Sequence, residues 1–285
     1  MRVVSTVAEL RTARRDFPRL GFVPTMGFLH EGHLSLVRAA KARMGAAACS
    51  IFVNPTQFAP TDDLARYPRD LERDLALLQA AGCDLVFTPS VAEMYPAGFS
   101  TRIEVEGVTA PLEGAVRPGH FSGVATVVAK LFNMVQPDAA WFGQKDAQQC
   151  AVLRRMARDL DLPVEIIVGE TVREPDGLAM SSRNVYLGPE DREAAVVLIR
   201  ALKAAESGFD AGERDAGGLR ARMTAVLEGE PRGKPDYVSI ADPDTLTELE
   251  VIDGRGAVAS LAVRFGQTRL IDNLLLGEAR QKWLR

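Results

Sequence analysis

The fold is decided by a stretch near the start of the chain, Leu20-Gly21-Phe22-Val23-Pro24-Thr25-Met26-Gly27-Phe28-Leu29-His30-Glu31-Gly32-His33. The apolar run from Leu20 to Val23 predicts a buried strand, and the periodic segment after the second histidine predicts a helix. A turn therefore connects a strand to a helix. Gly27 and Gly32 let the backbone come close to a ligand, and a helix start offers free N–H groups to an anion. The stretch is typical of a phosphate-binding site.

Two of the chain's three histidines, His30 and His33, lie in this stretch. A spacing of three places both side chains on one face of a turn, where imidazoles can donate hydrogen bonds to phosphate oxygens. Two other interpretations stay open. The pair could be ordinary polar residues of a surface turn, or it could bind a metal ion together with His120. The zinc signature H-E-x-x-H has its histidines four apart, which weighs against the metal.

Length and composition indicate an ordinary globular protein. The 285 residues suggest two domains, and 47% hydrophobic and 25% charged residues provide a normal core and surface. A net charge of −4 argues against a protein that coats nucleic acid. Residues 1–17 lack the apolar core of a signal peptide, and no apolar stretch approaches the roughly 18 residues of a membrane span. We expect no nucleic-acid or membrane partner.

The three cysteines, Cys49, Cys83 and Cys150, are scattered and odd in number. This usage favours a reduced, cytoplasmic protein over a disulfide scaffold.

Strands and helices alternate in the first part of the chain. We expect strands over 21–23, 47–53, 84–88, 139–142 and 164–168, with helices over 34–44, 69–81, 121–135 and 147–160. This alternation is typical of βαβ units and a parallel sheet, and such sheets bind ligands beyond the carboxyl ends of their strands. The predicted fold class is α/β, with a Rossmann-like domain over residues 1–172.

A polar segment over 170–177 marks the change to a second domain, which we place at residues 173–285. We expect helices over 189–206 and 214–228 and strands over 236–241, 257–263 and 268–273, which make a smaller α+β domain. Ser181, Ser182 and Arg183 could hold a phosphate tail from the side opposite to the first domain. We therefore expect this domain to act as a lid, with 170–177 as its hinge.

Neutral polar residues follow the second strand of the Rossmann-like domain. Asn54 and Gln57 offer hydrogen-bond donors and acceptors that suit a small hydroxylated carboxylic acid, although Asn54 and Pro55 could simply form a turn. Farther along, Gly119 and Gly123 surround His120, which indicates a backbone that must pass close to something.

A second strand–turn–helix junction contains Gly143-Gln144-Lys145-Asp146. Lys145 is a point charge for phosphate. Asp146 could cap the following helix or bind Mg²⁺. Gln149 lies one turn into that helix and points toward the same edge of the sheet.

Five motifs together make the chain resemble the pantoate–β-alanine ligase family. They occur in the order that the family has, and they are Pro24–His33, Phe52–Phe58, Arg117–Val135, Gly143–Gln149 and Met180–Asn184. His30-x-Gly-His33 and Met180-Ser181-Ser182 also resemble the paired signatures of the nucleotidyltransferase superfamily. The second signature of that superfamily is rich in lysine, and here Arg183 supplies the charge instead.

The resemblance implies an ATP-dependent ligase that works in two steps in pantothenate and coenzyme A biosynthesis. The carboxylate of (R)-pantoate attacks the α-phosphate of ATP, which gives pantoyl adenylate and pyrophosphate. β-Alanine then attacks the adenylate, which gives pantothenate and AMP. ATP is a substrate, Mg²⁺ accompanies it, and the protein is expected to be a homodimer.

The residue chemistry and the resemblance together assign the site. His33, His30 and Lys145 are the expected catalytic residues, and Asp146 is the expected Mg²⁺ ligand. Pantoate and β-alanine are expected to contact Gln57, Gln149, Asn54 and Met26. The residues expected to bind ATP are Pro24, Thr25, Met26, Gly27, Phe28, Leu29, His30, Glu31, Gly32, His33, Gly143, Gln144, Lys145, Asp146, Val172, Met180, Ser181, Ser182 and Arg183.

Three other functions fit parts of the sequence. A nucleotidyltransferase that moves AMP to a phosphate acceptor would share the histidine motif, but it would need a second basic pocket where Asn54 to Gln57 is neutral. A non-catalytic nucleotide-binding subunit would not need both histidines and Lys145. A metal hydrolase would use all three histidines.

Overall fold

The computed structural model describes residues 1–58, 64–65 and 67–284, and its contacts divide the chain into two compact units. Unit 1 comprises Met1–Gly143 and Gln148–Gly169, and unit 2 comprises Gln144–Ala147 and Glu170–Arg285. The short segment Gln144–Ala147 therefore clusters with unit 2, although the chain on both sides of it belongs to unit 1. From the sequence, this segment is expected in the first domain.

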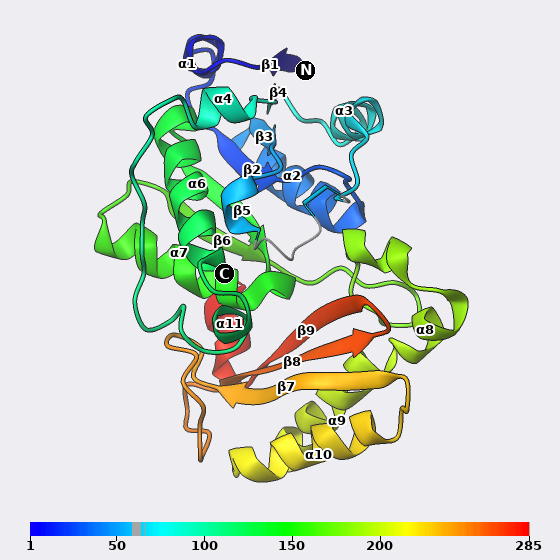
Figure 1. Ribbon diagram of the computed structural model, residues 1–285. Helices are drawn as coiled ribbons and strands as arrows, with labels where there is room; N and C mark the ends of the chain where they lie inside the picture. The colour runs from blue at the N-terminus through cyan, green and yellow to red at the C-terminus, as the bar shows by residue number, and fades with distance from the viewer. Residues whose placement is uncertain (59–63, 66, 285) are drawn as a thin grey trace. The chain divides into compact units, whose positions relative to one another are not determined.

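A six-stranded parallel sheet forms the centre of unit 1 (Figure 1). Its order is β1-β4-β3-β2-β5-β6, and the strands are β1 (Arg2–Val4), β2 (Gly21–Thr25), β3 (Ala47–Ile51), β4 (Leu85–Phe87), β5 (Ala139–Gly143) and β6 (Glu165–Gly169). The predicted α/β class is confirmed. The chain continues from β2 to β3 on one side and later adds β5 on the other side. Open sheets bind ligands where their strand order reverses in this way.

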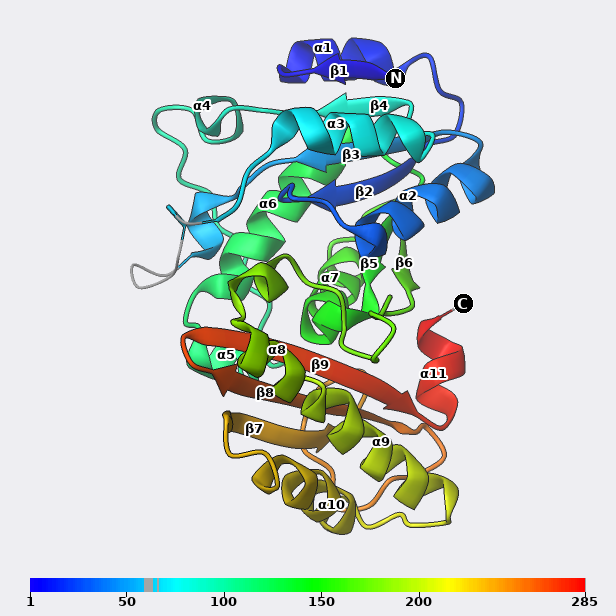
Figure 2. The same ribbon diagram turned by 90° about the vertical axis from the view of Figure 1, so that its right-hand side faces the viewer.

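Helices cover both faces of this sheet (Figures 1 and 2). One face carries α2 (Glu31–Met44) and α3 (Leu71–Ala80), and the other carries α6 (His120–Val135) and α7 (Ala147–Asp159). Shorter elements are α1 (Val7–Arg14), α4 (Val91–Met94), α5 (Glu113–Val116) and the 3₁₀ helix η1 (Pro55–Gln57). Apolar side chains of β2, β3 and β5 pack with those of α2 in a buried core, as expected for strands covered on both faces.

The start of α6 approaches the loop after β3 closely. A Cβ atom on Gly123 would lie 2.4 Å from the carbonyl oxygen of Thr56 and 2.8 Å from the Cα of Gln57. At the same junction, the side chain of Asn54 donates to the carbonyl of Gly123 at 3.2 Å. The predicted close approach is thus confirmed at Gly123, and it fixes the loop that carries Gln57.

Unit 2 contains a three-stranded antiparallel sheet with two long helices on one face (Figure 2). The strands are β7 (Gly233–Ala241), β8 (Ala257–Phe265) and β9 (Thr268–Leu276), and the covering helices are α9 (Val197–Asp210) and α10 (Ala216–Glu228). The 3₁₀ helices η2 (Gln144–Asp146) and η3 (Ser182–Tyr186) contact β9. Two further helices are α8 (Pro189–Ala194) and α11 (Glu278–Trp283). The predicted small α+β architecture is confirmed.

The prediction of one helix over 189–206 was wrong, because the chain forms α8 and α9 with a break at Ala195 and Val196. The N–H groups of Val196 and Leu198 donate to carbonyls three residues earlier, at 3.3 and 3.2 Å. These shorter turns interrupt the regular helical bonding. An apolar periodicity alone does not detect such a local tightening.

In the part of the chain that the structure describes, no helix is both long and apolar enough to cross a membrane. The cysteines Cys49, Cys83 and Cys150 are buried. Burial raises the pKa of the Cys83 thiol to about 11, so this side chain stays protonated and behaves as an apolar core residue.

Replacing Gly123 by Ala tests the close approach of α6 and η1. Alanine favours a helix interior over glycine by about 1 kcal/mol, but its Cβ would meet backbone atoms that cannot rotate away. We expect a net loss of roughly 1–3 kcal/mol in the free energy of unfolding, the range for overpacked sites. Urea denaturation measures this loss.

Gly188→Ala is the matched control, because a Cβ at Gly188 would have no heavy atom within 4 Å and its φ is −65°. This control should change the free energy of unfolding by less than about 0.5 kcal/mol. Equal effects of the two substitutions would contradict the proposed clash.

Candidate active site

The turn after β2 is held from inside unit 1 by the carboxylate of Asp74. Asp74 lies on α3 and is 1% exposed. Its Oδ2 accepts the N–H of Phe28 at 2.7 Å, and its Oδ1 accepts the N–H of Leu29 at 2.8 Å. Gly27 and Phe28 have φ angles of 84° and 51°, a left-handed conformation that costs a non-glycine residue about 1–2 kcal/mol. Bonds to a buried charge offset this cost.

The two histidines lie together where α2 begins. His30 is the residue that precedes α2, and its ring centroid lies 4.1 Å from that of His33. The Nδ1 of His33 accepts the backbone N–H of His30 at 3.3 Å. A neutral His33 in this arrangement carries its proton on Nε2.

Gln57 connects the loop after β3 to the turn that carries the histidines. The Nε2 of Gln57 donates to the sulfur of Met26 at 3.3 Å, and the Oε1 of Gln57 accepts from the amide of Asn54 at 3.0 Å. Three of the residues expected to contact the acid are therefore neighbours. Gln57 also lines a cavity of about 450 Å³ in unit 1, a size that suits a small organic ligand.

The side chain of Asn54 is occupied within the protein. It is 1% exposed. Its amide donates to Gln57 and Gly123, and its oxygen accepts from the hydroxyls of Thr56 at 2.9 Å and Tyr95 at 2.8 Å. Burial raises the pKa of Tyr95, so the phenol stays protonated and can donate this bond. Asn54 thus orients Gln57, and we infer no direct contact between Asn54 and substrate.

The remaining phosphate candidates lie on unit 2. Met180 donates its N–H to the carbonyl of Val172 at 3.0 Å, and the hydroxyl of Ser181 accepts the N–H of Arg183 at 3.2 Å. Residues 172–180 therefore form a hydrogen-bonded hairpin that leads directly into η3. Most of the segment expected to act as a hinge, 170–177, belongs to this hairpin.

The predicted site residues thus divide into two groups. Unit 1 holds Pro24, Thr25, Met26, Gly27, Phe28, Leu29, His30, Glu31, Gly32, His33, Asn54, Gln57, Gly143 and Gln149. Unit 2 holds Gln144, Lys145, Asp146, Val172, Met180, Ser181, Ser182 and Arg183.

The third histidine, His120, contacts the backbone of Gln57 and the side chain of Arg117. His120 donates from Nδ1 to the carbonyl oxygen of Gln57 at 2.8 Å, and its other ring nitrogen lies 3.2 Å from Arg117. Among the described residues, no group of three or more His, Cys, Asp or Glu side chains is arranged to hold a metal ion.

These observations define an α/β protein with a turn that carries two histidines at the carboxyl edge of a parallel sheet. A family model described as Pantoate-beta-alanine ligase matches residues 2–275. The chain belongs to this family. It is therefore an enzyme, a carbon–nitrogen ligase.

Relatives and solved structures agree with this assignment over nearly the whole chain. The pantothenate synthetases of Herpetosiphon aurantiacus and Chloroflexus aurantiacus are each 64% identical, cover 97% and 98% of this chain, and are themselves covered completely. The crystal structure of pantothenate synthetase from Thermus thermophilus has a TM-score of 0.92 at 55% identity, covering 96% of this chain and 99% of that one.

A more distant structure is that of a pantoate-beta-alanine ligase from Francisella tularensis, described as complexed with beta-gamma ATP and beta-alanine. It is 34% identical, with a TM-score of 0.79, and covers 96% of this chain and 97% of its own.

Asp74 was not among the residues predicted from the sequence, although a signal for it exists. Asp74 and Leu78 are four residues apart on the buried face of α3, and a carboxylate on such a face needs a partner. Its partners are backbone N–H groups 45 and 46 residues away in the sequence, which no local pattern identifies.

Replacing Asp74 by Ala tests the support of the turn. Two buried N–H groups would lose their acceptor, which costs roughly 1–3 kcal/mol of stability per group. The histidines should shift with the turn, so we expect kcat to fall at least ~10-fold, since small misplacements of catalytic groups are costly. Steady-state kinetics together with urea denaturation measure both effects.

Asp70→Ala is the matched control on the same helix. Asp70 accepts the N–H of Arg73 at 3.1 Å where α3 begins, so its loss should cost about 1 kcal/mol of stability and leave kcat within ~2-fold. If both variants lowered kcat equally, general weakening of α3 would explain the loss and the support of the turn would not.

Proposed function

We propose that the chain condenses (R)-pantoate with β-alanine at the expense of ATP, through a pantoyl-adenylate intermediate. Family membership supports the overall reaction. The relative that was solved with beta-gamma ATP and beta-alanine supports these two substrates. The observation that carries the mechanism is the contact between Gln57 and Met26, because it joins a residue that is proposed to bind pantoate to the histidine turn.

Pantoate binds in the pocket beside Gln57. Gln57 and Gln149 hold its hydroxyl and carboxyl oxygens, and Asn54 fixes the orientation of the Gln57 side chain through the 3.0 Å bond between them. The amides of Asn54 and Gln57 are neutral, so these two side chains do not reduce the nucleophilicity of the pantoate carboxylate. Membership of the ligase family over residues 2–275 disfavours the alternative of a nucleotidyltransferase.

In the first step, a carboxylate oxygen of pantoate attacks the α-phosphorus of ATP, and the bond from that phosphorus to pyrophosphate breaks. The protein needs no covalent nucleophile. It positions the reactants and stabilises the charge that develops on the phosphate oxygens. His33 donates from Nε2, His30 lies beside it, and Lys145 with Ser181, Ser182 and Arg183 binds the phosphate chain.

In the second step, the amine of β-alanine attacks the acyl carbon of the adenylate, and AMP leaves. An acyl adenylate is easily hydrolysed, so the site must exclude water while the intermediate exists. A closing motion of unit 2 over ATP would meet this requirement. Lys145 and the Met180–Arg183 segment would then reach the nucleotide together.

Mg²⁺ is expected to accompany ATP, and the residues present fit this ion. Asp146 has a half-exposed carboxylate whose Oδ1 lies 3.6 Å from the Nζ of Lys145. Mg²⁺ is commonly held by one or two carboxylates and the substrate phosphates, so Asp146 would hold it there. When bound, the ion neutralises phosphate charge.

We also infer a cytoplasmic homodimer, on the family resemblance and the reduced cysteines. A monomer mass by light scattering at micromolar protein concentration would refute the dimer.

An isotope-exchange assay tests the adenylate. With pantoate, ATP and Mg²⁺ but no β-alanine, we expect labelled pyrophosphate to enter ATP, because the first step is complete and reversible without the amine. A chelator or His33→Ala should suppress exchange, the latter by ~10²–10³-fold, the range for one lost transition-state contact. Formation of ADP and phosphate in place of AMP and pyrophosphate would reject the mechanism.

Gln57→Ala tests the acid pocket. A site that hydrogen-bonds hydroxyl groups loses affinity strongly when one partner is removed. We expect the KM for pantoate to rise at least ~10-fold, while the KM for ATP changes less than ~2-fold. Gln79→Ala, at an exposed position of α3, is the control and should change neither. Equal increases in both KM values for Gln57→Ala would place Gln57 outside the acid pocket.

A further inference from the structure

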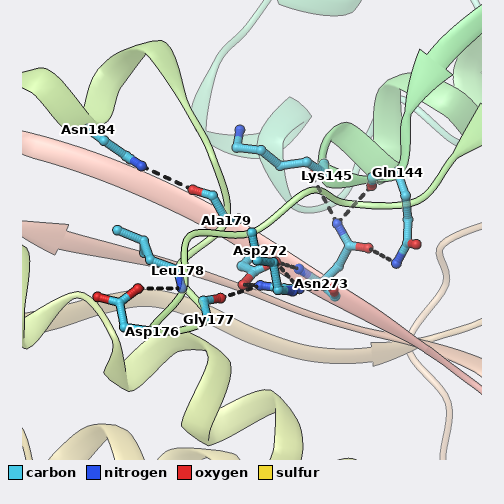
Figure 3. Close-up of polar contacts among 10 residues, drawn as sticks. Gln144, Lys145, Asp176, Gly177, Leu178, Ala179, Asn184, Asp272 and Asn273 are labelled. Atoms are coloured by element: carbon cyan, nitrogen blue, oxygen red, sulfur yellow. Dashed lines mark hydrogen bonds and ion pairs between the residues drawn. The ribbon is translucent and has the colours of Figure 1, made fainter. Parts of the chain in front are cut away.

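The side chain of Asn273 holds the backbone on which Lys145 is mounted. Asn273 lies on β9 of unit 2 and is 2% exposed. Its Nδ2 donates to the carbonyl oxygens of Gln144 at 3.0 Å and Lys145 at 2.9 Å, and its Oδ1 accepts from the Nε2 of Gln144 at 3.1 Å (Figure 3). Both amide hydrogens and the oxygen of Asn273 are therefore used on this one segment.

These bonds fix the peptide groups of η2 and do not involve the side chain of Lys145. In Figure 3 the side chain of Lys145 points away from Asn273. It is only 16% exposed, so its four-carbon stem is largely covered. An anchored backbone and a covered stem restrict where the ammonium group can lie, which is what a preorganised phosphate contact requires.

The neighbouring residue on β9 anchors the second phosphate segment. The side chain of Asp272 is fully buried and binds the guanidinium of Arg173 through two bonds, at 2.6 and 3.0 Å. Arg173 also donates to the carbonyl of Gly177 at 3.0 Å. This fork ties the hairpin over 172–180, which leads into Ser181 and Arg183, to the same strand.

We propose that Asp272 and Asn273 are positioning residues that mount both phosphate-binding segments on β9. Asn273 sets the backbone of Lys145, and Asp272 acts through Arg173 on the segment that ends in Ser181, Ser182 and Arg183. The two segments keep one fixed geometry within unit 2. The inference rests on the proposed function in one respect, because it takes Lys145 and Arg183 as phosphate contacts.

Buried polar side chains on a strand support this assignment. The sequence around the pair is apolar, Leu270-Ile271 before it and Leu274-Leu275 after it. A stable small sheet would be built more simply with apolar residues at 272 and 273, because buried polar groups contribute little net stability even when satisfied. Asp272 and Asn273 therefore serve to fix the geometry of the two segments that they hold.

Hydrogen exchange tests the anchoring directly. Asn273→Asp keeps the volume of the side chain but cannot donate to the two carbonyls, and Asn273→Ala is a second variant in case the buried charge prevents folding. We expect amide exchange in the peptide over 143–150 to become at least ~10-fold faster, since its bonds would open locally. Unchanged exchange in this peptide would overturn the inference, whatever the kinetics show.

Asn133→Asp is the matched control. Asn133 also donates its amide to a carbonyl, that of Ala129 at 2.8 Å within α6, and its loss should leave exchange over 143–150 unchanged. Arg173→Lys keeps the charge but loses the fork. It should speed exchange over 173–184 and leave 143–150 unchanged. No change over 173–184 would remove Asp272 and Arg173 from the proposal.

A double-mutant cycle separates positioning from general stability. Asn273→Asp should lower kcat by ~10–100-fold in the otherwise unchanged enzyme, since a displacement of about 1 Å can cost 10²-fold. In a Lys145→Ala background the same substitution should cost less than ~2-fold, because the group that it positions is gone. Equal losses in both backgrounds would show a structural role only and would refute the positioning of Lys145.

The cycle also distinguishes failure of this inference from failure of the proposed function. If Lys145→Ala alone left kcat unchanged, the assigned role of Lys145 in phosphate binding would be wrong. The exchange over 143–150 would still decide whether Asn273 anchors the segment.

Discussion

The pair of hydrogen bonds from Asp74 to the turn after β2 is the constraint on which the site depends. A buried carboxylate needs partners, and a left-handed turn at Gly27 and Phe28 needs a reason to persist. The N–H groups of Phe28 and Leu29 donate to the Asp74 carboxylate at 2.7 and 2.8 Å, which meets both requirements at once. Because α2 begins directly after this turn, the same two bonds also place both histidines and the sulfur of Met26 that contacts Gln57.

The two units contribute different kinds of chemistry. Among the residues proposed for the site, unit 1 holds neutral amides and imidazoles, whereas unit 2 holds Lys145 and Arg183 together with the hydroxyls of Ser181 and Ser182. Such a division suits a reaction that joins an acid to a triphosphate. A cation beside the carboxylate would lower its nucleophilicity, and a cation beside the phosphate chain stabilises the leaving pyrophosphate. The separation of charges along the chain thus follows from what each substrate needs.

The sequence predicted the repeating elements and missed what connects them. Strands β2, β3, β5 and β6 and the helices around them were predicted because apolar runs and periodicity are local signals. The break between α8 and α9 was missed, because two residues of tightened hydrogen bonding leave the apolar pattern intact. The motif residues were predicted by type and spacing. Their supports, Asp74 and Asn273, were not, because each acts on backbone groups far away in the sequence.

Gln144–Ala147 clusters with unit 2. The hydrogen bonds that hold this segment, and not its sequence motif, therefore determine the unit to which Lys145 belongs. A lysine that follows a strand of the parallel sheet is expected to belong to that sheet, and the chain on both sides of it does. Three hydrogen bonds between the segment and the buried side chain of Asn273 on β9 hold this lysine in unit 2. The motif supplies the charge, and the anchor determines which body the charge moves with. Under the proposed function, a motion of unit 2 would therefore carry Lys145 and the Ser181–Arg183 segment as one group.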